Sequence, residues 1–325
     1  MNVDVLTDEA ALGRLWPAWE ILWRRAPGAL PFSAPAWLRP WWTVYGTGRP
    51  VVAVLHGPSA LAGVLPLYRL QEKLLPMGVG ISDYCDVLLA PDAPREATGR
   101  LLAAALQAGD LPRCDLPQLA QSALLRAVEA PVGWRAESWA GPPCPVLSLV
   151  PGPAIPKGMR RDLRQARNRA DRSGGCQVER ADAERLTASL DTLVALHGAR
   201  WQRGVGAREA EPGVLADSAV LAFHRASAPA LLAAGLLRLE ILRLHGRAAA
   251  VIYALVNRER IFFYLSGFDP EYAFESPGTI LLGHMIEEAW REGLGAADFL
   301  RGAEAYKYAW GGIDRINLGR SFVRA

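Results

Sequence analysis

The sequence predicts a mixed α/β (α+β) fold of two tandem domains, each a mixed, mostly antiparallel sheet flanked by helices. Three observations lead to this prediction. The chain has 325 residues, and single cores seldom grow past about 250–300. A series of hairpin, strand, helix and short strand occurs in each half. A proline-rich connection at 141–157 lies between the halves, so we predict domains at 1–150 and 151–325.

The composition excludes several classes of protein. Hydrophobic residues make up 51% and charged residues 21%, which is typical of a globular protein. The net charge of +3 is too small to require a nucleic-acid partner. No membrane span is expected, because the longest apolar run is Ala248 to Val256 and a bilayer needs about 20 residues. The N-terminus does not resemble a signal peptide, so we expect a cytoplasmic protein.

Cysteine and histidine do not predict a metal site. The four cysteines are isolated, and no histidine has the spacing of a zinc ligand. His197 and His284 lie in amphipathic segments, where we interpret them as structural. We therefore expect no metal.

The first half begins with helices and a hairpin. Residues 1–25 are expected to form an amphipathic helix, because leucine and tryptophan recur at helical spacing. A second short helix is expected at 35–42. Apolar runs at 51–55 and 61–70 flank a Gly-Pro-Ser turn and predict a hairpin.

A polar cluster follows this hairpin. Asp83, Tyr84 and Asp86 stand where a glycine-rich turn enters a strand. Either one carboxylate binds or deprotonates an amine, or both only shape the turn, where aspartate is favoured. A helix at 95–108 and a short strand at 114–116 complete this half.

The second half opens with a basic helix. Arg160, Arg164 and Arg167 fall one above another, with apolar residues on a different face. The row either binds a phosphate-bearing donor or the acceptor stem of a tRNA, or is a solvated face. Further helices are expected at 183–202 and 214–235, and a hairpin at 237–244 and 247–256. Trp201, near the end of the first of these helices, is expected at the lip of a cleft.

The stretch from Phe262 to Gly311 is where we expect the chemistry. Its strand, at 261–267, is followed by a Ser-Pro-Gly-Thr turn that opens a helix. Ser276 is placed to cap this helix, and Pro277 suits its first position. A helix start of this kind binds anions through its N–H groups, and phosphate is the expected ligand.

A short buried strand at 296–300 and a polar loop come after this helix. If this strand is a parallel neighbour of the strand at 261–267, the loop lies near the helix start, because ligands bind at the carboxyl ends of strands. The loop contains Glu304, Tyr306 and Lys307, the last being one of only three lysines against 33 arginines. We therefore expect Tyr306 and Lys307 beside a bound phosphorylated group.

These segments resemble a known family. The run FFYLSGFDPEYAFESPGTILLGHMIEEA, then DFLRG and YKYAWG, resembles the CelD-like branch of bacterial acetyltransferases in the GNAT superfamily. It is more distantly similar to the Fem ligases, which add amino acids to peptidoglycan precursors. The resemblance implies two tandem GNAT-like domains, with an acyl-thioester or aminoacyl donor in the C-terminal one and the acceptor side in a degenerate N-terminal one.

One motif of the superfamily stands in an unsuitable place. GNAT enzymes commonly bind the donor pyrophosphate with R/Q-x-x-G-x-G/A, which Arg243 to Ala248 matches, but at a hairpin turn with no helix start. We assign the pyrophosphate to Glu275 to Thr279 instead. The expected donor-binding residues are Leu265, Ser266, Gly267, Ser276, Pro277, Gly278, Thr279 and Arg301. The expected co-substrate is acetyl-CoA or another acyl-CoA.

The expected reaction is direct transfer of the acyl group to a primary amine. No G-x-S-x-G elbow occurs and no cysteine stands in a nucleophile motif, so a covalent intermediate has no candidate residue. Glu304 is the first candidate for the base that deprotonates the amine, and Asp83 is the second. Tyr306 would protonate the departing thiolate, and the backbone N–H groups of Leu265 to Gly267 would stabilise the oxyanion.

Two basic residues near the polar loop have alternative interpretations. Lys307 either stabilises negative charge in the active site, as the Fem-like comparison implies, or is a surface lysine between core aromatic residues. Arg301 either orients the donor or pairs with Glu304. The residues expected to bind the acceptor are Tyr84, Asp86, Arg164 and Trp201.

Two other functions stay open beside acyl-CoA-dependent transfer to a small-molecule or peptide amine. A Fem-like, aminoacyl-tRNA-dependent transferase acting on a peptidoglycan-type peptide predicts a basic surface from the Arg160 helix to the Ser276 turn. A non-catalytic GNAT-like binding module predicts a donor groove blocked by side chains such as Tyr272 or Phe274.

Overall fold

The chain folds into two compact units. The structure, a computed structural model, describes residues 1–202 and 213–325, and at 200–202 only the backbone. The first unit comprises Met1–Pro143 and Arg315–Ala325, and the second comprises Cys144–Asp314. The C-terminal segment therefore groups with the first unit. Within the described parts of the chain, no helix is long and apolar enough to cross a membrane.

The first unit is built on a sheet with strand order β1-β2-β3-β4-β6-β13, in which β5 also pairs with β3. All of these pairs are antiparallel except β4 with β6, which run parallel. The strands are β1 (Asn2–Leu6), β2 (Arg49–His56), β3 (Leu61–Leu70), β4 (Lys73–Pro76), β5 (Leu88–Leu89), β6 (Arg113–Leu119) and β13 (Ile313–Arg324). The helices are α1 (Glu9–Arg25), α2 (Pro35–Tyr45) and α3 (Ala97–Gly109), with short 3₁₀ turns η1 (Pro31–Ser33) and η2 (Leu124–Arg126).

The N-terminus differs from its prediction. β1 pairs with β2, and α1 starts only at Glu9, where the side chain of Asp8 accepts a hydrogen bond from the N–H of Ala11 at 2.8 Å. The predicted helix over 1–25 is therefore wrong for its first residues. The run Asn-Val-Asp-Val-Leu alternates polar and apolar residues as a strand does, and the aspartate is a favoured N-cap.

The second unit is built on the strand order β7-β12-β11-β10-β9-β8, in which β11 and β12 run parallel and the other pairs are antiparallel. Its strands are the end of β7 (Trp134–Ser148), β8 (Cys176–Arg180), β9 (Leu237–Leu244), β10 (Arg247–Val256), β11 (Arg260–Phe268) and β12 (Ala296–Asp298). Its helices are α4 (Lys157–Arg172), α5 (Leu186–Gln202), α6 (Ser218–Ala233), α7 (Pro277–Arg291) and α8 (Ala305–Ala309), with 3₁₀ turns η3 (Val214–Ala216) and η4 (Pro270–Tyr272).

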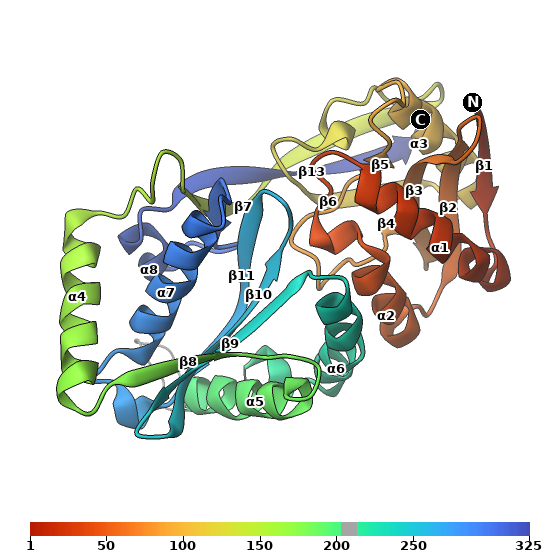
Figure 1. Ribbon diagram of the computed structural model, residues 1–325. Helices are drawn as coiled ribbons and strands as arrows, with labels where there is room; N and C mark the ends of the chain where they lie inside the picture. Colours follow the sequence, from red (N-terminus) through yellow and green to blue (C-terminus); the bar gives the residue numbers. More distant parts are fainter. Residues whose placement is uncertain (203–212) are drawn as a thin grey trace. The chain divides into compact units, whose positions relative to one another are not determined.

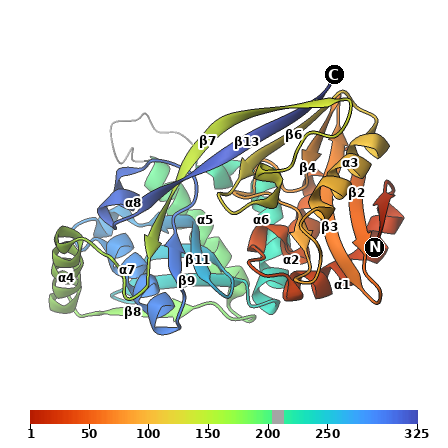
Figure 2. The same ribbon diagram turned by 90° about the horizontal axis from the view of Figure 1, so that it is seen from above.

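Helices cover both faces of this second sheet. α5 and α6 pack on one face of β9 to β11, and α7 packs on the other, with α4 outside α7 (Figure 1 and Figure 2). The core on the α7 side includes Leu163 of α4, Met285 of α7 and Phe263 of β11. α4 approaches α7 closely at Gly283, where a Cβ atom would lie 2.7 Å from the Leu163 side chain.

The proline-rich connection is only partly a loop. Pro142, Pro143 and Pro145 lie inside β7, which extends to Ser148. The predicted connection over 141–157 is therefore wrong for its first part. The fixed backbone angle of proline is compatible with an extended strand wherever no ladder N–H is needed.

Candidate active site

The site is built around an irregularity in β11. Tyr253 of β10 pairs with Leu265 and the next residue, Ala254, pairs with Phe263, so Tyr264 is one extra residue in β11. A β-bulge of this kind breaks the regular ladder and often lies beside an active site. The ring of Tyr264 packs against that of His224 of α6, and the two ring centroids lie 5.4 Å apart.

Beyond the bulge, β11 continues without its parallel neighbour. β12 runs parallel to β11 and pairs with it only at Arg260, Ile261 and Phe262, which meets the condition set in the sequence analysis. The remaining segment of β11, from Phe263 to Phe268, therefore lies past the end of this pairing. Parallel strands that part at their carboxyl ends leave room for a ligand between them.

The helix start is open on one side. α7 begins at Pro277, as predicted, and no atom lies within 4 Å of a Cβ atom built on Gly278. Ser276 stands at the N-cap position, but its side chain does not cap the helix, so that prediction is wrong. The backbone of Ser276 is left-handed, with φ of 55°, whereas a capping side chain needs an extended backbone. The Ser276 hydroxyl instead accepts a hydrogen bond from Arg169 of α4 at 3.1 Å.

A cavity of about 270 Å³ lies between the end of β11 and the start of α7. It is lined by Met159, Val251, Ile252, Phe263, Tyr264, Leu265, Ser266, Gly267, Phe268, Gly278, Thr279, Leu282, Tyr306 and Trp310. The lining thus includes Leu265 to Gly267 and Gly278, which the sequence assigned to the donor. None of the described residues that line the cavity has a charged side chain. Tyr272 and Phe274, which a non-catalytic module was expected to use to block the groove, are not among the lining residues.

The predicted polar loop contains a short helix, α8, which directs Tyr306 away from the pair formed by Glu304 and Lys307. Tyr306 lines the cavity, whereas Glu304 and Lys307 do not. Lys307 is only 3% exposed, and its Nζ atom donates hydrogen bonds to the carbonyls of Leu300, Arg301 and Gly302 at 2.6–3.3 Å. Glu304 lies 2.9 Å from the same Nζ atom, and its side chain is 56% exposed. Lys307 therefore holds the turn after β12 in place, and it is not a surface lysine.

Three predicted site residues lie in the first unit. Asp83 and Tyr84 are buried, and the carbonyl of Asp83 accepts a hydrogen bond from Asn317. The carboxylate of Asp86 accepts hydrogen bonds from the N–H groups of Leu124 and Leu125 at 2.7 and 3.1 Å. Burial raises the pKa of Asp86 to about 6, against the lowering effect of these bonds. Asp86 thus stabilises the start of η2.

The helix α4 contributes a residue that the sequence analysis did not select. Arg164 and Arg160 are exposed, and Arg167 pairs with Glu287 of α7 at 2.9 Å. Arg169, which contacts Ser276, lies outside the predicted arginine row and packs over the ring of Phe274 at 5.3 Å. No sequence pattern distinguishes it from its neighbours. The side chain of Trp201 lies outside the described residues.

A histidine set aside as structural also approaches the site. The Nδ1 atom of His197, on α5, donates to the carbonyl of Ser266 at 2.8 Å. At Gly267 the backbone of α5 comes so close that a Cβ atom would lie 2.4 Å from the N atom of His197. α5 thus fixes the position of the β11 segment that lines the cavity.

A sheet whose parallel strands part beside a bulge, with a helix start and a cavity at that opening, is the fold of an acyltransferase of the GNAT superfamily. Residues 157–308 match the family described as "Acetyltransferase (GNAT) domain". This segment, within the second unit, is therefore a GNAT domain of the CelD-like family, which confirms the resemblance found in the sequence. No curated protein matches the chain by sequence.

Solved structures share the fold of the whole chain. FemX has a TM-score of 0.67 at 12% identity, with 100% of this chain and 98% of that chain covered. L-PGS from Bacillus licheniformis has a TM-score of 0.59 at 14% identity, with 94% of this chain and 90% of that chain covered. A conserved protein of unknown function from Bacteroides thetaiotaomicron has a TM-score of 0.61 at 13% identity, with 99% of this chain and 100% of that chain covered. The predicted tandem GNAT-like fold is confirmed.

Proposed function

We propose that the chain is an N-acyltransferase that moves an acyl group from an acyl-CoA thioester to a primary amine. The observation that carries this proposal is the apolar lining of the cavity beside β11. An aminoacyl donor carries an ammonium group, which is costly to bury without a carboxylate partner. None of the described lining residues is acidic, so the cavity suits a neutral acyl chain and its thioester arm.

The start of α7 is the site at which we propose that the donor pyrophosphate binds. Gly278 and Thr279 line the cavity, and the first N–H groups of a helix attract phosphate through hydrogen bonds and the helix dipole. The space beside Gly278 leaves the backbone accessible. Arg169 at Ser276 adds a positive charge to the same turn.

The chemistry that we propose is direct attack of the amine on the thioester carbonyl. Glu304 takes a proton from the ammonium group, and the neutral nitrogen forms the new C–N bond. Backbone N–H groups of Leu265 to Gly267 stabilise the oxyanion, and one such donor is worth about 2.7–4 kcal/mol. The C–S bond then breaks, the Tyr306 hydroxyl protonates the thiolate, and the Tyr306 phenolate takes the second proton from the amide nitrogen. Lys307 positions Glu304 and the turn after β12.

A second candidate, an aminoacyl-tRNA-dependent transferase, is favoured by α4. This helix carries one lysine and six arginines against two aspartates, and Arg169 brings its positive charge to the turn before α7. A basic surface near the helix start is what the Fem-like alternative predicts, because Lys and Arg neutralise RNA phosphates. The Arg167 pair with Glu287 removes one charge from that surface.

Calorimetric titration with acetyl-CoA and a longer acyl-CoA tests the proposal. We expect binding by the unmodified protein and its loss in Gly278→Trp, whose side chain has room to enter the cavity. The matched control is Gly13→Trp on the exposed side of α1, where a Cβ atom also meets nothing within 4 Å. Binding that survives Gly278→Trp would place the donor elsewhere. No heat with either thioester, together with aminoacyl transfer from charged tRNA, would favour the second candidate.

A further inference from the structure

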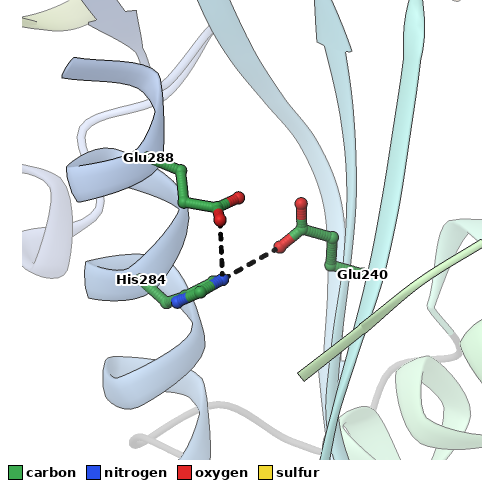
Figure 3. A group of neighbouring side chains, drawn as sticks. All are labelled: Glu240, His284 and Glu288. Atoms are coloured by element: carbon green, nitrogen blue, oxygen red, sulfur yellow. Dashed lines mark ion pairs between the residues drawn. The ribbon is translucent and has the colours of Figure 1, made fainter. Parts of the chain in front are cut away.

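A cluster of a histidine and two glutamates joins α7 to β9, away from the proposed donor cavity. His284 and Glu288 lie one turn apart on α7, and Glu240 projects from β9 toward them (Figure 3). The Nε2 atom of His284 lies 3.6 Å from Glu288 Oε1 and 3.9 Å from Glu240 Oε2. One ligand atom from each of the three residues lies within 4.8 Å of the others.

Arg180 of β8 holds the far side of both carboxylates. Its Nε atom lies 2.9 Å from Glu240 Oε1, and its Nη2 atom lies 2.6 Å from Glu288 Oε2. Each carboxylate therefore gives one oxygen to Arg180 and turns the other toward His284. Hydrogen-bonded carboxylates of this kind are oriented for metal binding by their outer partners.

The oxygen of Glu240 that faces His284, which we call its inward oxygen, lacks a hydrogen-bond donor among the described residues. The Glu240 side chain is only 1% exposed, and its Oε2 atom accepts no hydrogen bond from the described residues. A buried carboxylate oxygen without a partner is costly. Arg180 pairs with both carboxylates and also lies 3.9 Å from Glu292, so its single positive charge does not balance them, and a further cation at the inward oxygens would do so.

We propose that Glu240, His284 and Glu288 bind one zinc ion. Imidazole nitrogen and carboxylate oxygen are zinc ligands at about 2.0–2.2 Å, which places neighbouring ligands of a tetrahedral site about 3.4 Å apart. The two distances to His284 Nε2 are close to this spacing. The His284 and Glu288 side chains are 31% and 29% exposed, so the ion can enter from solvent and water can complete its shell.

Such an ion would fasten the middle of α7 to β9. This role does not depend on the proposed acyl transfer, because none of the three ligands lines the cavity. A ligand that binds only the folded state raises the unfolding temperature. Zinc would therefore stabilise the second unit whatever the donor is.

Calorimetry on the full chain, after treatment with a chelator and dialysis, tests this site with Zn²⁺ and, separately, Mg²⁺. We expect one Zn²⁺ per chain, bound at least about tenfold more tightly than Mg²⁺, because imidazole favours zinc. His284→Gln should weaken Zn²⁺ binding at least about tenfold and abolish the zinc-dependent rise in unfolding temperature. Glu288→Gln provides a second test with an exposed ligand, in case the first variant fails to fold.

The matched control is Glu292→Gln, at the C-cap position directly after α7. Glu292 pairs with Arg238 and lies 3.9 Å from Arg180, yet it is not one of the three ligands, so zinc affinity should not change. Absence of zinc binding, or zinc affinity equal in the unmodified protein and His284→Gln, would overturn the proposal. In the first case His284 and the two glutamates form only an ion-pair network, and in the second the zinc binds elsewhere.

Discussion

Two helices of this chain occupy matching places in their units but begin differently. α3 precedes β6, which is parallel to β4, and α7 precedes β12, which is parallel to β11. At the start of α3, Ala97 and Thr98 are buried, at 0% and 2% exposure. At the start of α7, Gly278 lines a cavity.

The difference comes from the strands. β4 ends at Pro76, two residues after its last pairing with β6, whereas β11 runs from its last pairing at Phe262 to Phe268. In the second unit the strand extends past its partner, and the cavity lies beside this extension, in front of the helix. The comparison supports the donor site that we propose in the second unit, and the following predictions test it.

The largest effect is expected for Glu304→Gln. Loss of a general base typically costs about 10²–10⁴-fold in rate, so kcat for acyl transfer should fall by that factor. Steady-state kinetics with acetyl-CoA and an amine acceptor measure it, and calorimetry checks that donor binding is kept. Full turnover by this variant would transfer the role of base to Asp83 and weaken the contrast between the units.

Lysines of the two units should differ in their contribution to stability. Lys307→Met leaves three backbone carbonyls without their donor in a buried turn, which should lower the free energy of unfolding by about 3 kcal/mol. Lys73→Met removes an exposed pair with Asp115 and should cost less than about 1 kcal/mol. Denaturant unfolding measures both. Equal losses would contradict the structural role of Lys307.

Tryptophan substitutions at the two helix starts should have opposite consequences. Ala97→Trp overpacks a buried position and should destabilise the protein by about 1–3 kcal/mol. Gly278→Trp enters open space, so it should block the donor with a much smaller change in unfolding temperature. If both variants unfold at the same lowered temperature, the start of α7 is as closed as that of α3.

Acid should act with opposite sign on two buried groups, one in each unit. Burial, and to a lesser extent His197, lower the pKa of His224 to about 3 from 6.5, so stability falls as the pH drops from 6.5 to 3. The raised pKa of Asp86, about 6 against 3.8, makes stability rise as the pH drops from 6 to 3.8. Each slope is at most about 1.4 kcal/mol per pH unit.

These two slopes oppose each other between pH 4 and 6, and His224→Phe removes one of them. We expect this variant to lose less stability than the unmodified protein as the pH falls from 6 to 4, measured by denaturant unfolding at each pH. A variant whose stability follows that of the unmodified protein at every pH would show that His224 titrates normally.

The sequence predicted the order of β11, α7 and β12, because turn residues and apolar runs are local signals, whereas the parallel pairing of the two strands entered only as a condition. It could not predict the conformation of Ser276, since capping depends on a backbone angle that the residue type leaves free. The burial of Lys307 and the contact of Arg169 with Ser276 depend on tertiary packing. Glu240 and His284 are brought together by the fold alone, so their spacing carried no signal.

Tyr264 is a single inserted residue whose neighbours on both sides keep regular partners in β10. A chain lacking that one codon would preserve every cross-strand pair of β10 and β11, but it would lose the extra peptide group from the wall of the cavity. The architecture of the second unit and its proposed chemistry are thus separable by one deletion in the gene. Non-catalytic descendants of such a protein can therefore arise with every side chain except that of Tyr264 unchanged.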